Sequence, residues 1–263
     1  MSAAMGATGP SPKLAFEGIT LDYPGLRVLD GIDLSLADGE FLAIVGPSGC
    51  GKSTLLRLAS GLLDPTGGRV LLDGKPVSGP PPGVGFMFQR DTLMPWADVR
   101  RNVEVGLVLG GTPTRERPAR LAELLALVGL TDFAGHRPAQ LSGGMRQRVA
   151  LARLLAYAPD IYLLDEPFGA LDAQTKITMG RELLRIWSQR RRSVVFVTHD
   201  IEEAVTLADR VVVMAPRPGR VRSIHRVDLP RPRDPRSLRA DARFREICAA
   251  IWNHIVEEEP AHD

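Results

Sequence analysis

The amino-acid sequence predicts an α/β fold in which a mainly parallel β-sheet carries helices on its faces, with an antiparallel β lobe before it and a helical lobe inserted into it. Short apolar runs typical of buried strands alternate with stretches of helical spacing along much of the chain. The first part instead shows alternating runs and glycine turns, and a long central stretch shows helical spacing alone. The 263 residues suffice for one large domain with a small inserted lobe.

Composition is that of an ordinary globular protein. Charged residues make up 24% and hydrophobic residues 44%, and the net charge of +2 is too small to indicate nucleic acid or an anionic membrane as partner. The two cysteines, Cys50 and Cys248, form no metal or disulfide pattern, which fits a reducing compartment. No apolar run approaches the ~20 residues that a membrane-spanning helix needs. Residues 1–12 lack the features of a signal peptide and are predicted to be a disordered leader.

The antiparallel lobe is predicted for residues 14–38. Its short alternating runs are interrupted by Pro24-Gly25, Asp30-Gly31 and Asp38-Gly39, which is typical of strands joined by turns. The next apolar run, Phe41–Val45, ends in glycine and leads into a stretch of helical character. This order predicts a buried parallel strand followed by a helix over about residues 53–60.

The remaining sheet and the inserted lobe follow from the same patterns. Further strands are predicted at residues 69–72, 83–88, 161–164, 193–198 and 210–214. Between 99 and 158 no strand pattern occurs, while residues 121–128 have helical spacing and 144–157 predict a second helix. We therefore expect a helical lobe over about residues 95–158, inserted between two strands.

The end of the chain is predicted to be a helical tail. The Pro/Arg-rich segment 216–235 predicts a loop with one hairpin. Phe244, Ile247, Cys248, Ile251 and Ile255 then line one face of a final helix. We expect residues 13–235 to form the main domain and residues 236–263 to form a tail that packs on it.

A phosphate-binding loop is predicted between the strand Phe41–Val45 and the helix that follows it. The segment Gly-Pro-Ser-Gly-Cys-Gly-Lys-Ser matches G-x-x-x-x-G-K-[ST] in the structural context which that motif requires. Its glycines let backbone N–H groups turn toward phosphate oxygens, Lys52 supplies a charge to the β- and γ-phosphates, and Ser53 supplies a hydroxyl to Mg²⁺. A nucleotide and Mg²⁺ are therefore expected at this loop, and the resemblance described below implies that the nucleotide is ATP. The residues expected to bind the nucleotide here are Gly46, Pro47, Ser48, Gly49, Cys50, Gly51, Lys52, Ser53 and Thr54.

Two acids end the strand predicted at 161–164. The carboxyl ends of strands in such sheets face the ligand crevice. There Asp165 can coordinate the Mg²⁺ held by Ser53, and Glu166 can polarise a water in line with the γ-phosphate. A solvated acidic pair is the alternative interpretation, and the phosphate-binding loop favours the first.

Residues 141–148, Leu-Ser-Gly-Gly-Met-Arg-Gln-Arg, resemble the signature sequence of ABC ATPases. A serine hydroxyl and glycine N–H groups at a helix start form a second anion-binding edge, made here by Ser142, Gly143 and Gly144. In that family this edge binds the γ-phosphate of the nucleotide held by the other protomer. Met145 departs from the commoner glutamine, so nothing is inferred from its side chain. The resemblance covers residues 14–214 and implies a P-loop NTPase with a RecA-like sheet.

Four further positions match the family one at a time. Tyr23 matches the aromatic residue that stacks on adenine, with a core tyrosine as the alternative. Gln89 matches the glutamine that touches Mg²⁺ and the attacking water. Asp172 lies in the loop that crosses the dimer interface, with Gly169 where serine is more frequent. His199 matches the switch histidine that hydrogen-bonds the γ-phosphate. The resemblance thus implies catalytic roles for Glu166, His199 and Gln89, and metal contacts from Ser53, Gln89 and Asp165.

The resemblance implies the ATP-hydrolysing subunit of an ABC transporter. Such a subunit works as a nucleotide-sandwiched homodimer under a transmembrane permease, on the cytoplasmic face of the inner membrane. Residues 93–96, Leu-Met-Pro-Trp, with Asn102-Val103, and the Arg-Pro-Gly-Arg run 217–220 resemble importers of nitrate, taurine and aliphatic sulfonates. An extracytoplasmic substrate-binding protein would then be an indirect partner, and no nucleic acid is expected.

Several alternatives remain open from the sequence. Trp96 is either an anchor for the permease or part of the core. An ABC exporter ATPase shares all the core motifs. A non-transport ABC ATPase is disfavoured because the chain has neither a long coiled-coil insertion nor a second cassette, and a small-molecule kinase with the same loop leaves the signature unexplained.

Overall fold

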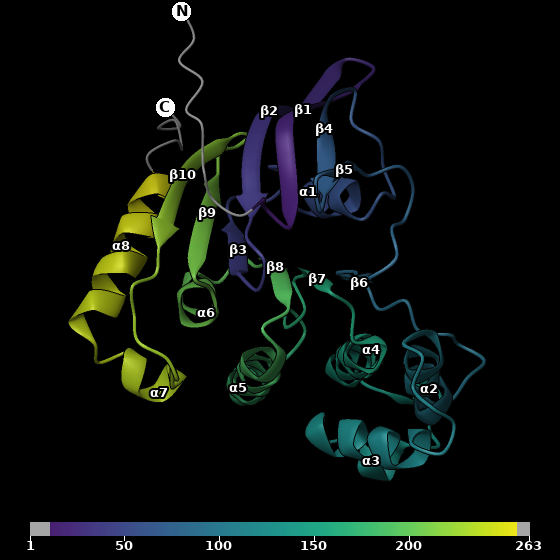
Figure 1. The fold of residues 1–263 in the computed structure, drawn as a ribbon. Helices are drawn as coiled ribbons and strands as arrows, with labels where there is room; N and C mark the ends of the chain where they lie inside the picture. Colours follow the sequence, from purple (N-terminus) through teal and green to yellow (C-terminus); the bar gives the residue numbers. More distant parts are fainter. Residues whose placement is uncertain (1–10, 257–263) are drawn as a thin grey trace, which may run out of the picture.

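The computed structural model describes residues 11–256 and contains two β-sheets and a set of helices (Figure 1). A four-stranded antiparallel sheet has the order β2-β1-β4-β5, and a six-stranded sheet has the order β10-β9-β3-β8-β7-β6. The second sheet is parallel except for β10, which pairs antiparallel with β9. This arrangement confirms the predicted α/β fold with its antiparallel β lobe. Residues 1–10 of the predicted leader and 257–263 of the predicted tail lie outside the described residues.

The antiparallel sheet is more continuous than the sequence predicted. Its strands are β1 Leu14–Tyr23, β2 Leu26–Leu36, β4 Gly67–Leu72 and β5 Lys75–Pro76. Asp30-Gly31 was predicted as a turn, and this prediction is wrong, because both residues lie inside β2. Ile19 pairs with Ile32 while Leu21 pairs with Leu29, so β2 holds one extra residue at that point. Gly31, with φ 65°, permits this β-bulge without ending the strand.

The six-stranded sheet lies between two hydrophobic cores. Its strands are β3 Phe41–Val45, β6 Val84–Met87, β7 Ile161–Asp165, β8 Ser193–Val197, β9 Arg210–Met214 and β10 Val221–Arg226. Alternation along each strand divides its side chains between the cores: Ile161 and Leu163 pack toward the antiparallel sheet, and Tyr162 and Leu164 pack toward the helices. Burial on both faces explains the continuous apolar runs in the sequence.

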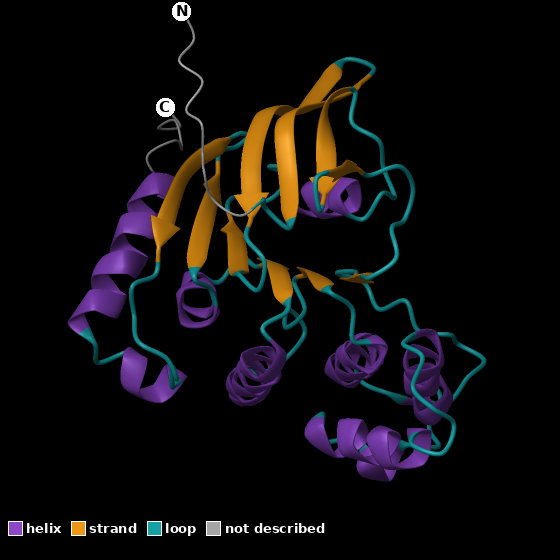
Figure 2. Cartoon of the chain, in the orientation of Figure 1, coloured by secondary structure: helices purple, strands orange, loops and turns teal. Residues whose placement is uncertain are grey.

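Helices cover both faces of this sheet (Figure 2). They are α1 Lys52–Ala59, α2 Val99–Leu109, α3 Arg117–Leu127, α4 Gly143–Tyr157, α5 Ala173–Arg190, α6 Ile201–Leu207, α7 Pro235–Leu238 and α8 Ala242–Val256. α2, α3 and α4 form the inserted helical lobe, which packs as a unit beside the sheet. Phe244, Ile247 and Ile251 of α8 are buried against the helical-side core. Within residues 11–256, no helix combines the length and apolar character needed to cross a membrane.

Candidate nucleotide-binding site

The loop between β3 and α1 requires glycine for its path. Gly46 and Gly51 have φ values of 151° and 97°, which side chains other than glycine rarely adopt. A Cβ atom at Gly46 would lie 2.7 Å from the carbonyl oxygen of Met214, and one at Gly51 would lie 2.5 Å from the Leu29 side chain. The backbone therefore makes its tight turn just before the N-terminus of α1, where N–H groups attract anions.

Lys52 lies inside this loop rather than in solvent. It is 7% exposed, and its Nζ donates to the carbonyl oxygens of Gly46 at 2.7 Å and Pro47 at 2.9 Å. The charge is thus held at the centre of the loop by backbone carbonyl oxygens. Burial raises the pKa of the neighbouring Cys50 thiol, which keeps it neutral and is consistent with its interpretation as an incidental loop residue.

Ser53 and Asp165 bring two oxygen ligands together beside the loop. Ser53 Oγ donates to Asp165 Oδ1 at 3.0 Å, although the two residues are far apart in sequence. Asp165 is buried at the end of β7, and this burial raises its pKa. Hydroxyl and carboxylate oxygens form the donor set that Mg²⁺ prefers, with phosphate oxygens and waters completing the shell. These residues therefore fit a Mg²⁺ ion that accompanies a nucleotide.

Three further side chains meet at one carboxylate oxygen. Gln89 Nε2 donates to Glu166 Oε2 at 3.2 Å, and His199 Nδ1 lies 3.5 Å from the same atom. The three residues follow β6, β7 and β8, which are neighbouring parallel strands, so their carboxyl ends place these groups at one edge of the sheet. Glu166 has a left-handed backbone with φ 47°, and its N–H donates to Val197 O at 2.9 Å. The backbone therefore turns sharply at the residue whose carboxylate lies next to both Gln89 and His199.

A cavity of about 390 Å³ opens beside these groups. Its walls include Gln89, Glu166 and six residues of the loop region, namely Ser48, Gly49, Gly51, Lys52, Ser53 and Thr54. Most of the predicted phosphate-binding residues and two of the three predicted catalytic residues therefore surround one space, whereas Gly46, Pro47, Cys50 and His199 do not line it. Arg217 also lines it, and its Nε donates to Gly49 O at 3.1 Å. In the sequence, Arg217 stood out only as the first residue of the Arg-Pro-Gly-Arg run 217–220, with no expected contact to the nucleotide. Its place here depends on long-range pairing, in which Gly219 N donates to Val28 O at 2.8 Å.

The signature edge lies at the N-terminus of α4, and the predicted interface loop with Asp172 lies at the N-terminus of α5. Ser142 caps α4, where its Oγ accepts from Met145 N at 3.2 Å. Asp172 caps α5 and accepts from Thr175 N at 2.9 Å; its hydrogen bonds with Thr175 lower its pKa. The two segments touch, because Ala170 N donates to the buried Gln147 of α4 at 2.9 Å. Gln147 belongs to the signature segment, but its spacing there gives no indication of this contact with Ala170.

These residues are not gathered around the Lys52 cavity. Among the described residues that line it, none belongs to the signature edge of Ser142, Gly143 and Gly144, and neither Asp172 nor Tyr23 is included. Tyr23 lies at the end of β1 and is 49% exposed, so its side chain is not in the core. One chain therefore presents two separate polar edges, one at Lys52 and one at Ser142.

The fold and the groups around Lys52 define a P-loop NTPase. A family model described as "ABC transporter" matches residues 29–169. A putative ATP-binding protein of Brucella abortus is 50% identical over 96% of both chains. The taurine import ATP-binding protein TauB of Pseudomonas entomophila is 48% identical over 93% of this chain and 97% of that one.

A solved structure agrees with the sequence comparisons. The dimeric post-hydrolysis state of the ATP-binding cassette MJ0796, bound to ADP and Pi, is 33% identical with a TM-score of 0.75, covering 82% of this chain and 99% of that one. The chain belongs to the ABC transporter family as an ATP-binding subunit, and it is an ATPase.

Proposed function

We propose that this chain is the energy-coupling ATPase of an importer, and that two copies bind two ATP molecules between them. The observation that carries the proposal is the separation of the Ser142 edge and Asp172 from the chain's own Lys52 cavity. A second copy placed head to tail would bring its Ser142 edge to that cavity. Similarity to cassettes whose structures are dimeric supports this assembly.

In this proposal the chain's own groups divide the work of hydrolysis. Lys52 and the loop N–H groups would hold the β- and γ-phosphates, and Ser53 with Asp165 would hold Mg²⁺, which when bound would neutralise phosphate charge. Glu166 accepts the proton of the attacking water. Gln89 and His199 flank its Oε2 and orient the carboxylate. Catalysis here is mainly positioning, with charge neutralised at each phosphate.

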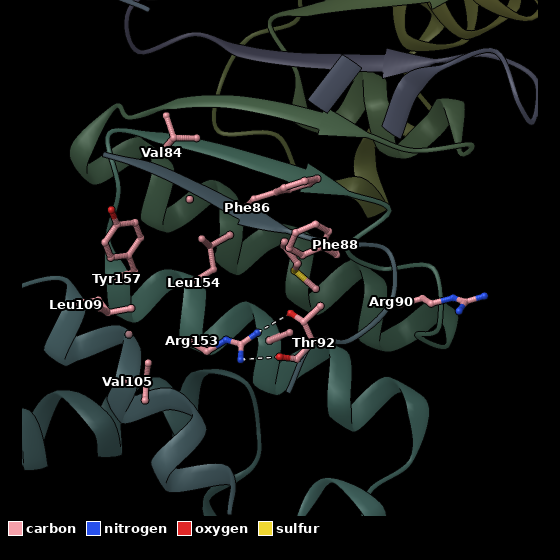
Figure 3. Close-up of a pocket in the computed structure, with 14 residues that line it drawn as sticks. Val84, Phe86, Phe88, Arg90, Thr92, Val105, Leu109, Arg153, Leu154 and Tyr157 are labelled. Carbon is pink, nitrogen blue, oxygen red and sulfur yellow. Dashed lines mark hydrogen bonds between the residues drawn. The ribbon is translucent and has the colours of Figure 1, made fainter. Parts of the chain in front are cut away.

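The proposed permease site is a groove beside the Gln89 loop. A cavity of about 300 Å³ lies between β6, α2 and α4, and Val84, Phe86, Leu109 and Tyr157 contribute its apolar walls (Figure 3). Thr92 is fixed at its rim because Arg153 donates to its carbonyl oxygen at 3.0 Å and its hydroxyl at 2.9 Å. Phe88 and Arg90, the residues on either side of Gln89, both line the groove, so a helix bound in it would be linked mechanically to the γ-phosphate region.

Trp96 extends this apolar surface. Its side chain is 74% exposed, which excludes the core interpretation that the sequence left open. A second hollow beside it is lined by Met94, Arg101, Val105 and Val108. We assign this face to the permease, because an exposed tryptophan beside a groove is typical of a protein-binding surface.

The proposed substrate class is taurine or a related sulfonate, by similarity to the taurine-import relatives. The chain would then sit on the cytoplasmic face of the inner membrane, held there by the permease and supplied through an extracytoplasmic binding protein. Residues 13–235 would form the ATPase domain, with the helical lobe at about 95–158, and residues 236–263 its tail. An exporter ATPase remains the second candidate because it uses the same nucleotide site.

Reconstitution tests this proposal. The chain is co-purified with its permease and inserted into proteoliposomes with the binding protein. ATP hydrolysis should rise when the binding protein carries taurine, and labelled taurine should move toward the side that holds the ATPase. Complexes carrying Glu166→Gln serve as the control for ATP dependence. Transport in the opposite direction, or ATPase activity indifferent to the loaded binding protein, would contradict the importer assignment.

A further inference from the structure

Two histidines and a serine meet where α8 covers β10. His225 Nε2 lies 3.0 Å from His254 Nδ1, and Ser223 Oγ lies 3.0 Å from the first nitrogen and 2.8 Å from the second. Ser223 and His225 are two residues apart on β10 and so share a face, while His254 belongs to the last turn of α8. All three are half-buried, which leaves the cluster accessible from solvent.

Hydrogen bonds cannot account for all three contacts of this cluster at once. A ring nitrogen of neutral histidine either carries a hydrogen and donates, or carries a lone pair and accepts. If one nitrogen is protonated, it and the serine hydroxyl supply two hydrogens for three contacts. If both are protonated, two N–H groups face each other, and if neither is, two lone pairs do. In every neutral arrangement, one contact lacks a hydrogen bond of its own.

A single cation would satisfy all three atoms together. A triangle with edges of 2.8, 3.0 and 3.0 Å has its centre about 1.7 Å from each corner. A transition-metal ion with donor distances of about 2.0–2.1 Å would therefore stand about 1.2 Å above the triangle. The donor–metal–donor angles are then close to a right angle, as on one face of an octahedral or tetragonal site. The ring centroids are 5.0 Å apart, so the two nitrogens occupy the facing edges of the rings.

We propose that Ser223, His225 and His254 form a binding site for a divalent transition metal, with water in the remaining positions. Two imidazoles and a hydroxyl in this geometry suit Ni²⁺ or Cu²⁺ better than Zn²⁺, whose structural sites are tetrahedral. Among residues 11–256 no set of three His, Cys, Asp or Glu side chains could hold a metal ion, so this site depends on serine as its third donor. Its affinity should accordingly be modest.

The surroundings favour a cation at this position. Burial, together with the neighbouring His254, lowers the pKa of His225. The C-terminal end of a helix also attracts positive charge, and His254 is in the last turn of α8. A bound ion would fasten that turn to β10 at the edge of the sheet.

Metal titration of the untagged, chelator-treated full-length chain tests the site without nucleotide. Calorimetry should show one equivalent of Ni²⁺ and of Cu²⁺, with Cu²⁺ tighter and Mg²⁺ not bound. Either ion should raise the thermal unfolding midpoint. His225→Gln and His254→Gln should each abolish this equivalent, and Ser223→Ala should weaken it roughly tenfold, whereas ATP hydrolysis should be unchanged in all three.

Three control substitutions separate this site from the other histidines. His136→Gln, His199→Gln and His262→Gln, the last outside the described residues, should each retain the bound equivalent. Retention in His254→Gln, or no binding by the folded wild type, would overturn the proposal. A midpoint that depends on pH but not on Ni²⁺ would likewise overturn it, because the histidines would then be a hydrogen-bonded pair. None of these outcomes depends on the proposed importer function.

Discussion

The nucleotide end of the six-stranded sheet and the outer face of the helical lobe are built in opposite ways. At the first, charged groups are buried and each is held by specific partners: Lys52 by two carbonyl oxygens and Asp165 by Ser53. At the second, apolar side chains remain exposed, with Trp96 at 74% and Leu109 at 70%.

Each region therefore carries a free-energy cost that a binding partner would remove. Buried charge is costly to desolvate, and clustered apolar surface is costly to expose. MgATP would relieve the first cost, and a permease the second. The segment that begins at Gln89 joins the two regions, and we propose that coupling runs along it. Substitutions at each end should affect different measurements.

The largest expected effect on nucleotide affinity belongs to Lys52→Ala. Removing the charge at the centre of the loop should weaken MgATP binding about 100-fold, because charge-assisted hydrogen bonds to phosphate are lost. The chain should stay folded. Isothermal titration with MgATP and a turnover assay measure this, with the exposed Lys75→Ala as the matched control. Undiminished affinity and turnover would end the assignment of the phosphate loop.

Glu203, on the helix that follows His199, tests the cost of buried charge. Burial raises its pKa from 4.5 to about 7. Because the folded-state pKa is the higher one, its contribution to stability is complete below pH 4.5 and is lost as the pH rises through 7. In Glu203→Gln the new side chain can still accept a hydrogen bond from Thr198. The wild type should lose about 2 kcal/mol of unfolding free energy between pH 5 and 8, and Glu203→Gln should not show this loss.

Chemical denaturation at both pH values measures this difference. The exposed neighbouring substitution Glu202→Gln is the control and should leave the pH dependence in place. If Glu203→Gln and the wild type lose the same stability between pH 5 and 8, Glu203 is already ionised across this range and carries no such cost.

Arg217→Ala should weaken nucleotide binding about tenfold while turnover at saturating ATP changes little, because the guanidinium lines the cavity beside Gly49 and has no part in proton transfer. Steady-state kinetics separates the KM and kcat effects, and Arg217→Lys should recover part of the affinity. Arg220→Ala, in the same loop but paired with Asp30, is the control. An unchanged KM in Arg217→Ala would remove this residue from the site.

The smallest effect on the isolated chain is expected for Trp96→Ala. Basal ATPase activity and stability should change little because the side chain is exposed. In the reconstituted transporter, however, stimulation of ATPase activity should fall several-fold. Trp252→Ala on α8, also exposed, should leave stimulation intact. If Trp96→Ala loses basal activity and stability together, the proposed docking face is wrong.

Local patterns explain what the sequence could predict. Buried parallel strands such as Phe41–Val45 appear as apolar runs, and the phosphate loop has a fixed spacing of glycines and lysine, so both were placed from neighbouring residues alone. The turn predicted at Asp30-Gly31 was wrong because a turn and a β-bulge both favour glycine with positive φ. Only the partner strand distinguishes them, since β1 pairs on both sides of the bulge.

Features that depend on contacts between residues far apart in the sequence could not be predicted from local patterns. Arg217 reaches the loop because its own segment pairs with Val28, far away in the sequence. His225 and His254 meet only when α8 packs on β10. Trp96 has the same apolar character whether buried or exposed, so its exposure required the fold.

The shared active site is the central claim, and light scattering with and without ATP tests it most directly. In Glu166→Gln the site keeps its shape but lacks the base, so turnover should fall at least 100-fold and ATP should convert the protein to a dimer. Adding Ser142→Arg blocks the edge offered to the partner's nucleotide and should return the protein to monomer. A Glu166→Gln protein that stays monomeric with ATP, together with full turnover by Ser142→Arg alone, would contradict a site formed by two copies.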